Sequence, residues 1–329
     1  MILSHLVQKM LNLGYNKYTV TISNLLNKAY KILEHVSQTP ELDTEVVLAH
    51  VLDQDKAYLI SHSEDDVDLE QEEEFIGLIN RRAEGEPIAY LTGKKEFYGL
   101  DYFVNKHVLI PRPETEQLVE LVFEEVRRKV LRHGSGQAIS DKLGAKSNKR
   151  EIRIIDVGTG SGNIGITLLN LIIKNKLNKK VKFVVYMTDI SGKALRIAEK
   201  NYKNLIPKRA NIKALFIKAD LLKGFNSRFN IIVSNPPYIP SGQIDLLDKN
   251  VKDFEPHLAL SGGELGMKFI RDLISQGTKR LAKSGKLFIE IHEDLPERIK
   301  LYIEENFPNW TVVFEKDVFG EWRFAIISK

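Results

Sequence analysis

The second half of the chain alternates short apolar strands with helices, and this alternation limits the possible folds more than any other feature of the sequence. Strands that alternate with helices form a parallel sheet covered by helices on both faces. The last two apolar runs are close enough to form a hairpin, which would place one antiparallel strand at the sheet edge. We therefore predict a doubly wound, Rossmann-like α/β domain with strands over residues 153–158, 182–190, 212–220, 229–233, 285–293, 310–317 and 323–329.

The first part of the chain shows a different periodicity. Apolar residues recur at helical spacing from about residue 21 to residue 84, which predicts a small helical domain over residues 1–85. Two short β-like runs follow, joined by a glycine turn, and predict a hairpin linker over residues 86–117. The α/β domain then takes residues 118–329, and it begins with a helix that we expect to end near residue 131, before an exposed loop over residues 133–151.

Composition excludes several classes of protein. The chain has no cysteine, so thiolate metal sites are excluded, and His292, which follows a buried strand, has no partner at metal-ligand spacing. The formal charge of +4, from 48 basic and 44 acidic residues, is too even to indicate direct binding of nucleic acid. No apolar run reaches the roughly 18 residues of a membrane span. We expect a soluble monomer without a metal ion and without a membrane partner.

A glycine-rich turn follows the first predicted strand of the α/β domain. The strand ends at Asp156 and continues into Gly158, Thr159, Gly160, Ser161 and Gly162 before a helix begins. Glycines at this point let the backbone approach a ligand, and the start of the helix offers free N–H groups. The motif predicts a nucleotide-like cofactor. By itself it also allows a dinucleotide enzyme, or a turn with no ligand.

Acidic residues end the next two strands. Asp189 stands at the end of the second, where a carboxylate can accept hydrogen bonds from both hydroxyls of a ribose. Asp220 and Leu221 follow the third, where an acid would lie near an adenine amino group and an apolar side chain on the ring face. An acid at the end of a strand can equally be a helix cap.

The sequence SNPPYIP, directly after a buried strand, contains the most specific motif. Pro236 and Pro237 remove two N–H donors and leave backbone carbonyls free to accept hydrogen bonds. Asn235 adds a neutral carbonyl acceptor, and Tyr238 offers a ring face on which a flat group can stack. Together they suit a substrate NH2 group conjugated to a carbonyl or a ring, held in position for reaction.

These motifs together resemble the class I S-adenosylmethionine methyltransferases of the NPPY group. The segments EFYG at residues 96–99, HVLIPRPETE at 107–116, DFEPHLAL at 253–260, GGELGMKFI at 262–270 and KDVFGEWR at 316–323 narrow the resemblance. They are similar to the PrmC or HemK branch, the peptide chain release factor glutamine methyltransferases. The resemblance extends from the helical domain to the last strand.

The resemblance implies transfer of a methyl group from S-adenosylmethionine to the N5 amide of the glutamine in the GGQ loop of class 1 peptide chain release factors. It implies that the cofactor is bound by Gly158, Thr159, Gly160, Ser161, Gly162, Asp189, Asp220, Leu221 and Asn235. It implies that Asn235, Pro236, Pro237 and Tyr238 hold the glutamine amide, with Asn235, Pro236 and Tyr238 as catalytic residues. The helical domain would dock the release factor.

Three questions stay open. Arg112, Glu114 and Glu116 either brace the cofactor side of the pocket or form a structural ion pair between domains. The same pocket would also suit an amino methyltransferase acting on a nucleic-acid base. The first acidic residue is Glu34, and a loop around residues 134–150 is long for a compact bacterial member. Both features favour a mitochondrial location, with the bacterial cytoplasm as the alternative.

Overall fold

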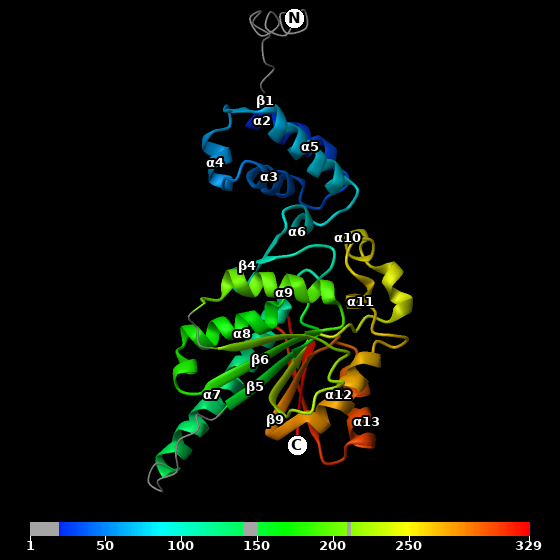
Figure 1. Ribbon diagram of the computed structural model, residues 1–329. Helices are drawn as coiled ribbons and strands as arrows, with labels where there is room; N and C mark the ends of the chain where they lie inside the picture. The colour runs from blue at the N-terminus through cyan, green and yellow to red at the C-terminus, as the bar shows by residue number, and fades with distance from the viewer. Residues whose placement is uncertain (1–19, 141–150, 209–211) are drawn as a thin grey trace, which may run out of the picture. The chain divides into compact units, whose positions relative to one another are not determined.

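The chain forms two compact units. The computed structural model describes residues 20–140, 151–208 and 212–329. Unit 1 is Met1–Thr92 and unit 2 is Gly93–Lys329. Each unit has its own hydrophobic core, and each is described below by itself (Figure 1).

From residue 20 onward, unit 1 is a helical domain with a short antiparallel strand pair. Its elements are β1 (Val20–Thr21), α2 (Ile22–Leu33), α3 (Pro40–Val51), α4 (Lys56–Ser61), β2 (Asp66–Val67), α5 (Leu69–Ala83) and α6 (Ile88–Leu91). The carboxylate of Asp68 caps the start of α5, because it accepts a hydrogen bond of 2.8 Å from the Gln71 amide. Apolar side chains of α2, α3 and α5, including Leu25, Val47 and Phe75, are buried together.

The boundary of unit 1 lies later in the chain than the sequence indicates. The periodicity predicts its end at residue 85, but the division falls between Thr92 and Gly93. The reason is α6, a helix of a single turn that is too short to show in the hydrophobic pattern. It contacts α3 and α5 and buries Tyr90 and Leu91, so it belongs to the helical unit.

The predicted hairpin follows and belongs to unit 2. Strands β3 (Lys94–Phe97) and β4 (Leu100–Phe103) pair in antiparallel fashion around a two-residue turn. Tyr98 and Gly99 both have positive φ, 55° and 71°, as the tightest hairpin turns require. Asn201 fixes the hairpin to the α/β core, since its side chain accepts a bond of 2.8 Å from the Phe103 amide and donates one of 2.9 Å to the Phe103 carbonyl.

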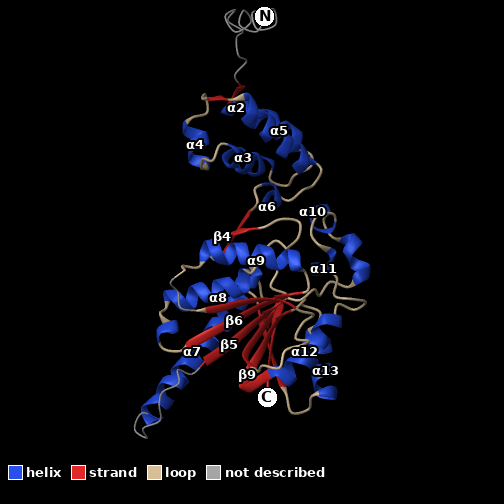
Figure 2. Ribbon diagram, in the orientation of Figure 1, coloured by secondary structure: helices blue, strands red, loops and turns tan. Residues whose placement is uncertain are grey.

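A seven-stranded mixed sheet forms the centre of the described part of unit 2, in the order β10-β11-β9-β8-β5-β6-β7 (Figure 2). Strands β9, β8, β5, β6 and β7 are parallel, as predicted. The strands are β5 (Glu151–Val157), β6 (Lys182–Asp189), β7 (Lys213–Lys218), β8 (Phe229–Ser234), β9 (Leu281–Glu290), β10 (Thr311–Lys316) and β11 (Trp322–Ser328).

The antiparallel strand is not at the sheet edge, so that part of the prediction is wrong. Strand β11 lies between β9 and β10 and is antiparallel to both, and β10 forms the edge. The physical reason is the difference in apolar character between the two strands of the hairpin. Phe324, Ala325 and Ile327 of β11 are fully buried, whereas β10 has alternate exposed residues such as Val313.

Helices cover both faces of the sheet. Helices α7, α8 and α9 lie on one face, and α12 and α13 lie on the other (Figures 1 and 2). The helical elements of unit 2 are α7 (Glu114–Ser140), α8 (Asn163–Lys174), η2 (Leu177–Lys179), α9 (Gly192–Leu205), η3 (Ser241–Leu246), α10 (Lys249–Lys252), α11 (His257–Leu260), α12 (Lys268–Arg280) and α13 (Pro296–Asn306).

The first helix of the α/β region is longer than predicted. Helix α7 continues to Ser140 instead of ending near residue 131. Gly134 and Gly136 suggest a loop there, but no proline interrupts the backbone hydrogen bonds between residues 132 and 140, so the helix can continue. The rest of the predicted loop, residues 141–150, lies outside the described residues.

Candidate active site

The glycine-rich turn lies between the carboxyl end of β5 and the start of α8. Gly158, Gly160 and Gly162 all have positive φ, at 72°, 55° and 85°. A Cβ atom on Gly158 or Gly160 would meet nothing within 4 Å, so the backbone borders open space at both residues. A Cβ atom on Gly162 would lie 2.5 Å from Cδ1 of Ile166. Two glycines therefore leave room for a ligand, and the third leaves space for the Ile166 side chain of α8.

Asp189 ends β6 beside this turn. Its Oδ2 accepts a hydrogen bond of 3.0 Å from the amide of Gly160, and its Oδ1 accepts one of 2.8 Å from the amide of Ser191. Burial raises the pKa of the Asp189 carboxyl, while both backbone bonds act in the opposite direction. The carboxylate lines the cavity described below and keeps lone pairs for a ligand.

The residues after β7 also line the cavity. Asp220 forms an ion pair with Lys223, three residues along the chain. Leu221 has a φ of 52°, which is rare for a residue with a branched side chain, and it packs on the main core of unit 2. Both predicted residues thus reach the cavity, and Lys223 stands beside them.

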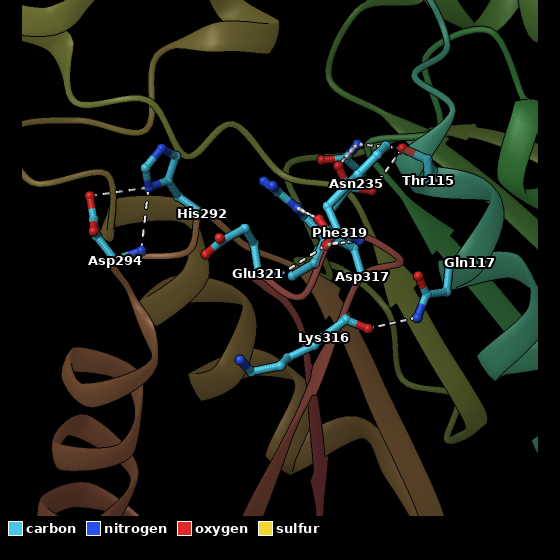
Figure 3. Close-up of polar contacts among 11 residues, drawn as sticks. Thr115, Gln117, Asn235, His292, Asp294, Lys316, Asp317, Phe319 and Glu321 are labelled. Carbon is cyan, nitrogen blue, oxygen red and sulfur yellow. Dashed lines mark hydrogen bonds and ion pairs between the residues drawn. The ribbon is translucent and has the colours of Figure 1, made fainter.

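Asn235 follows β8, and a buried hydrogen-bond network holds its side chain. Its Nδ2 donates to Oε1 of Glu290 at 2.9 Å and to Oγ1 of Thr115 at 3.2 Å. Figure 3 shows Asn235 and Thr115 turned toward each other. The Thr115 hydroxyl in turn donates to Oε2 of Glu290 at 2.7 Å. Both amide protons of Asn235 are therefore engaged, and neither bond uses its Oδ1.

Glu290 lies at the end of β9 and is 1% exposed. Burial raises the pKa of its carboxyl to about 7, and Glu114 adds to the increase. The hydrogen bonds from Thr115 and Asn235 and the positive charge of Arg323 lower the pKa. Arg323 is itself bound to another acid, Asp317, at 3.1 Å.

The other residues of the NPPY motif are divided between the cavity and the core. Asn235 and Pro237 line the cavity, whereas Pro236 and Tyr238 are not among its lining residues. Tyr238 packs against the main core of unit 2, and its burial raises the pKa of its hydroxyl. Its ring lies 6.1 Å from that of His292, measured between centroids.

Two glycines clamp the backbone of the NPPY motif. A Cβ atom on Gly262 would lie 2.7 Å from Cα of Tyr238, and one on Gly266 would lie 2.2 Å from the Tyr238 carbonyl oxygen. The amide of Ile239 donates to the Leu260 carbonyl at 3.1 Å, and the amide of Gly262 donates to the Ile239 carbonyl at 2.7 Å. Only glycine permits this approach, so the 262–266 segment fixes the position of the motif.

The charged residues before α7 have separate positions. Arg112 lines the cavity and pairs with the buried Glu255 at 2.6 Å. Glu116 accepts a bond of 2.7 Å from the backbone amide of Tyr98, in the hairpin turn. Neither Glu114 nor Glu116 is among the cavity-lining residues. Arg112 therefore borders the cavity and also forms a structural ion pair, and that pair lies within unit 2.

The cavity has a volume of about 480 Å³, within the range of sites for small molecules and cofactors. It collects most of the predicted site residues, because the carboxyl ends of the parallel strands meet at one edge of the sheet. Gly162, Pro236 and Tyr238 are the predicted residues outside its lining. Those that line it are Gly158, Thr159, Gly160, Ser161, Asp189, Asp220, Leu221, Asn235 and Pro237.

Sequence reasoning missed three residues that organise this site. Thr115 and Glu290 hold Asn235, and Asn201 donates a bond of 2.8 Å to the carbonyl of Ser161 in the glycine turn. An acid within the apolar strand 285–293 is a signal that could have identified Glu290. Thr115 lies within the segment IPRPETE, between Glu114 and Glu116, and no local pattern there predicts a role for it in the site.

The described residues contain no group of three or more His, Asp or Glu side chains that could hold a metal ion. The carboxylates and glycines that line the cavity suit an organic cofactor. Among the described residues, no helix is long and apolar enough to cross a membrane.

Comparison with known proteins identifies two matching domain families. The PrmC N-terminal domain matches residues 24–93, and the methyltransferase small domain matches residues 137–320. A release factor glutamine methyltransferase of Koribacter versatilis is 35% identical over 295 residues, which are 89% of this chain and 92% of that protein. A protein of the same name in Leptospira interrogans is 35% identical over 94% of this chain and 98% of that protein. Another, in Bacillus anthracis, is 34% identical over 85% of this chain and 90% of that protein.

Proposed function

Because this chain belongs to the family of release factor glutamine methyltransferases, we propose that it methylates the N5 amide of the glutamine in the GGQ motif of a class 1 peptide chain release factor. The observation that supports this most strongly is the Asn235 side chain. Its two amide protons are engaged by Glu290 and Thr115, neither bond uses its Oδ1, and Asn235 is one of the residues that line the cavity.

The cavity suits S-adenosylmethionine, which supplies an electrophilic methyl group when bound and leaves as S-adenosylhomocysteine. Open space beside Gly158 and Gly160 lets a ligand approach the backbone of the glycine turn. The Asp189 carboxylate would accept the ribose hydroxyls, and Asp220 and Leu221 would contact the adenine.

The protein's contribution to the reaction is to position the substrate amide. An amide nitrogen is a poor nucleophile because its lone pair is delocalised into the carbonyl. Asn235 Oδ1 would accept one of the two amide protons, and a carbonyl oxygen of the proline pair would accept the other, so that the nitrogen faces the methyl group. The bond between nitrogen and the methyl carbon would form as the bond between that carbon and the sulfonium sulfur breaks, so that S-adenosylhomocysteine leaves with the electron pair on sulfur and the methylated amide releases one proton to solvent.

The pocket is fully built from unit 2, so unit 1 is left for another role. We propose that unit 1 docks the release factor. Its support is the match of residues 24–93 to a domain that occurs at the N-terminus of this family.

For the compartment, we propose the mitochondrion. The support is the lack of acidic residues before Glu34 in the sequence. The named relatives are bacterial, which is compatible with the bacterial cytoplasm as the alternative. Imaging the full-length protein with a fluorescent tag at its C-terminus would decide between them, because cytoplasmic fluorescence would contradict the proposal.

The proposed reaction is tested by incubating the protein with methyl-labelled S-adenosylmethionine and a release factor in two forms. One form has the native GGQ motif, and the other has alanine in place of its glutamine. We expect label on the glutamine of the first form and none on the second, as located by peptide mass spectrometry. Label that enters added nucleic acid instead of protein would contradict the proposal and favour a base-modifying enzyme.

A further inference from the structure

We propose that Glu290 and Thr115 are positioning residues for methyl transfer, because together they fix the direction in which the Asn235 carboxamide faces. This inference rests on the proposed function, in which Asn235 Oδ1 accepts a proton of the substrate amide. A carboxamide can rotate by half a turn with little change in shape, and this would exchange its oxygen for its nitrogen. The productive orientation must therefore be selected by the neighbours of Asn235.

The hydrogen bonds of this network permit one arrangement. Nδ2 of Asn235 lies 2.9 Å from Oε1 of Glu290 and 3.2 Å from Oγ1 of Thr115. The Thr115 hydroxyl uses its single proton on Oε2 of Glu290, at 2.7 Å, so toward Asn235 it can only accept. The ionised carboxylate of Glu290 is also an acceptor only. Rotation of the carboxamide would place its oxygen against two acceptors and leave its protons without these partners.

The network is sealed from water, which makes the selection strong. Thr115 and Glu290 are each 1% exposed. A buried polar atom that loses its hydrogen bond has no solvent to replace the partner, so the wrong orientation carries the full cost of desolvation. The network also joins three elements of unit 2, since Thr115 lies on α7, Glu290 ends β9 and Asn235 follows β8.

The charged groups around Glu290 change the pKa of its carboxyl in opposite directions. Glu114 on α7 opposes ionisation of the carboxyl, and Arg323 on β11 favours it. Tyr238 of the NPPY segment adds a neutral hydroxyl, and Arg323 is shared with the carboxylate of Asp317. Burial is the largest influence and raises the pKa of Glu290 to about 7.

Protonation of Glu290 would remove the selection. A protonated carboxyl can donate to Thr115, whose hydroxyl proton is then free to turn toward Asn235. The rotated carboxamide would find a donor for its oxygen, so both orientations become possible. The rate of methyl transfer should therefore decrease as the pH falls through the pKa of Glu290, and it should increase above that pKa.

The main test is Glu290→Gln in the full-length protein, assayed for methyl transfer to a release factor between pH 5.5 and 9. Glutamine can donate or accept, so it fills the space without selecting an orientation. We expect kcat at pH 8 to fall by about 10- to 100-fold, which is typical of a misplaced catalytic group. The decrease of kcat at low pH should disappear, and the Kd for S-adenosylmethionine, measured by calorimetry, should stay within about twofold because the other cofactor-binding residues, from Gly158 to Leu221, lie outside this network.

Glu125→Gln is the matched control. Glu125, like Glu290, is a buried glutamate, but it lies on α7 and its partners are Arg128, Lys129 and Lys286 rather than residues of the pocket. A loss of buried charge at this site tests the effect of general destabilisation. We expect wild-type kcat and a wild-type pH profile for the folded Glu125→Gln protein.

A pair of threonine variants gives a second test that does not depend on folding of Glu290→Gln. Thr115→Val removes the hydroxyl with little change in volume and should lower kcat, whereas Thr115→Ser keeps the hydroxyl and should restore most of it. Wild-type kcat and pH profile in both Glu290→Gln and Thr115→Val would overturn the inference. Failure of the wild-type protein to methylate any release factor would instead overturn the proposed function, and the inference with it.

Discussion

Asp189 joins the glycine turn to the cavity, and its substitution tests the cofactor site at the level of a single residue. Asp189→Ala removes the carboxylate that bonds to Gly160 and that would accept the ribose hydroxyls. We expect the affinity for S-adenosylmethionine to fall by about 10- to 100-fold, the usual effect of losing hydrogen bonds to a charged group. Calorimetry of the purified variant measures it, and an unchanged affinity would rule out this role.

Asp156 is a buried carboxylate, and its ionisation should make the free energy of unfolding depend on pH. Its Oδ2 accepts bonds from Thr159 at 2.6 Å and from the Gly165 amide at 3.0 Å, but its Oδ1 has no partner among the described residues. Burial raises its pKa to about 7 in the folded protein. The folded state therefore binds a proton that the unfolded state releases near pH 3.8. The associated stability is complete below that pH and is lost as the pH rises through about 7.

The substitution Asp156→Asn removes this titration. As the pH rises from 5 to 7, the unfolding free energy of wild type should fall relative to that of the variant, by at most about 1.4 kcal/mol per pH unit. Glu290 titrates in both proteins and cancels in the difference. Urea unfolding without cofactor at pH 5, 6, 7 and 8 measures it. Parallel stability curves would show that Asp156 is ionised throughout this range.

The sequence allows the residues that border the cavity to be predicted better than those that support them. Asp189 and Asn235 stand out because each follows an apolar strand, and their motifs are local. The bond from Thr115 to Glu290 joins residues 175 positions apart, and the bond from Asn235 to Glu290 joins residues 55 apart. No local pattern contains such a pairing, so the positioning network is visible only in the fold.

At the scale of elements, the 262–266 segment packs against the backbone of the NPPY motif and fixes its position. Gly266→Ala would place a Cβ atom 2.2 Å from the carbonyl oxygen of Tyr238, at a backbone φ of 72° that alanine adopts poorly. The motif must shift, so we expect kcat for methyl transfer to fall by about 100-fold or more. Gly242→Ala is the control, since its Cβ atom would meet nothing within 4 Å. Equal activity of the two variants would show that this segment does not position the motif.

The identity of the strands could be predicted, but part of their order could not. The parallel strands follow from alternation with helices, a pattern that the sequence displays directly. The position of β11 between β9 and β10 depends on which strand of the hairpin pairs with β9. That choice comes from burial on both faces, seen in Phe324 and Ala325, and from long-range pairing such as Phe324 with Glu290.

At the scale of the whole molecule, the two units should have separable roles. A protein that begins at residue 93 retains the hairpin, the sheet and every residue that lines the cavity. We expect it to bind S-adenosylmethionine with unchanged affinity and to lose most of its activity on an intact release factor. Circular dichroism would confirm that it folds. Methylation of intact release factor at the wild-type kcat/KM would contradict the docking role proposed for unit 1.

The central claim is that Asn235 orients the amide that receives the methyl group. The most direct measurement is the single-turnover rate of methyl transfer to a release factor by wild type and Asn235→Ala, with cofactor affinity determined in parallel. We predict that Asn235→Ala lowers the rate by about 100-fold or more, as expected for the loss of an oriented hydrogen-bonding group. Its cofactor affinity should be reduced only slightly. A variant that transfers methyl groups at the wild-type rate would contradict the account.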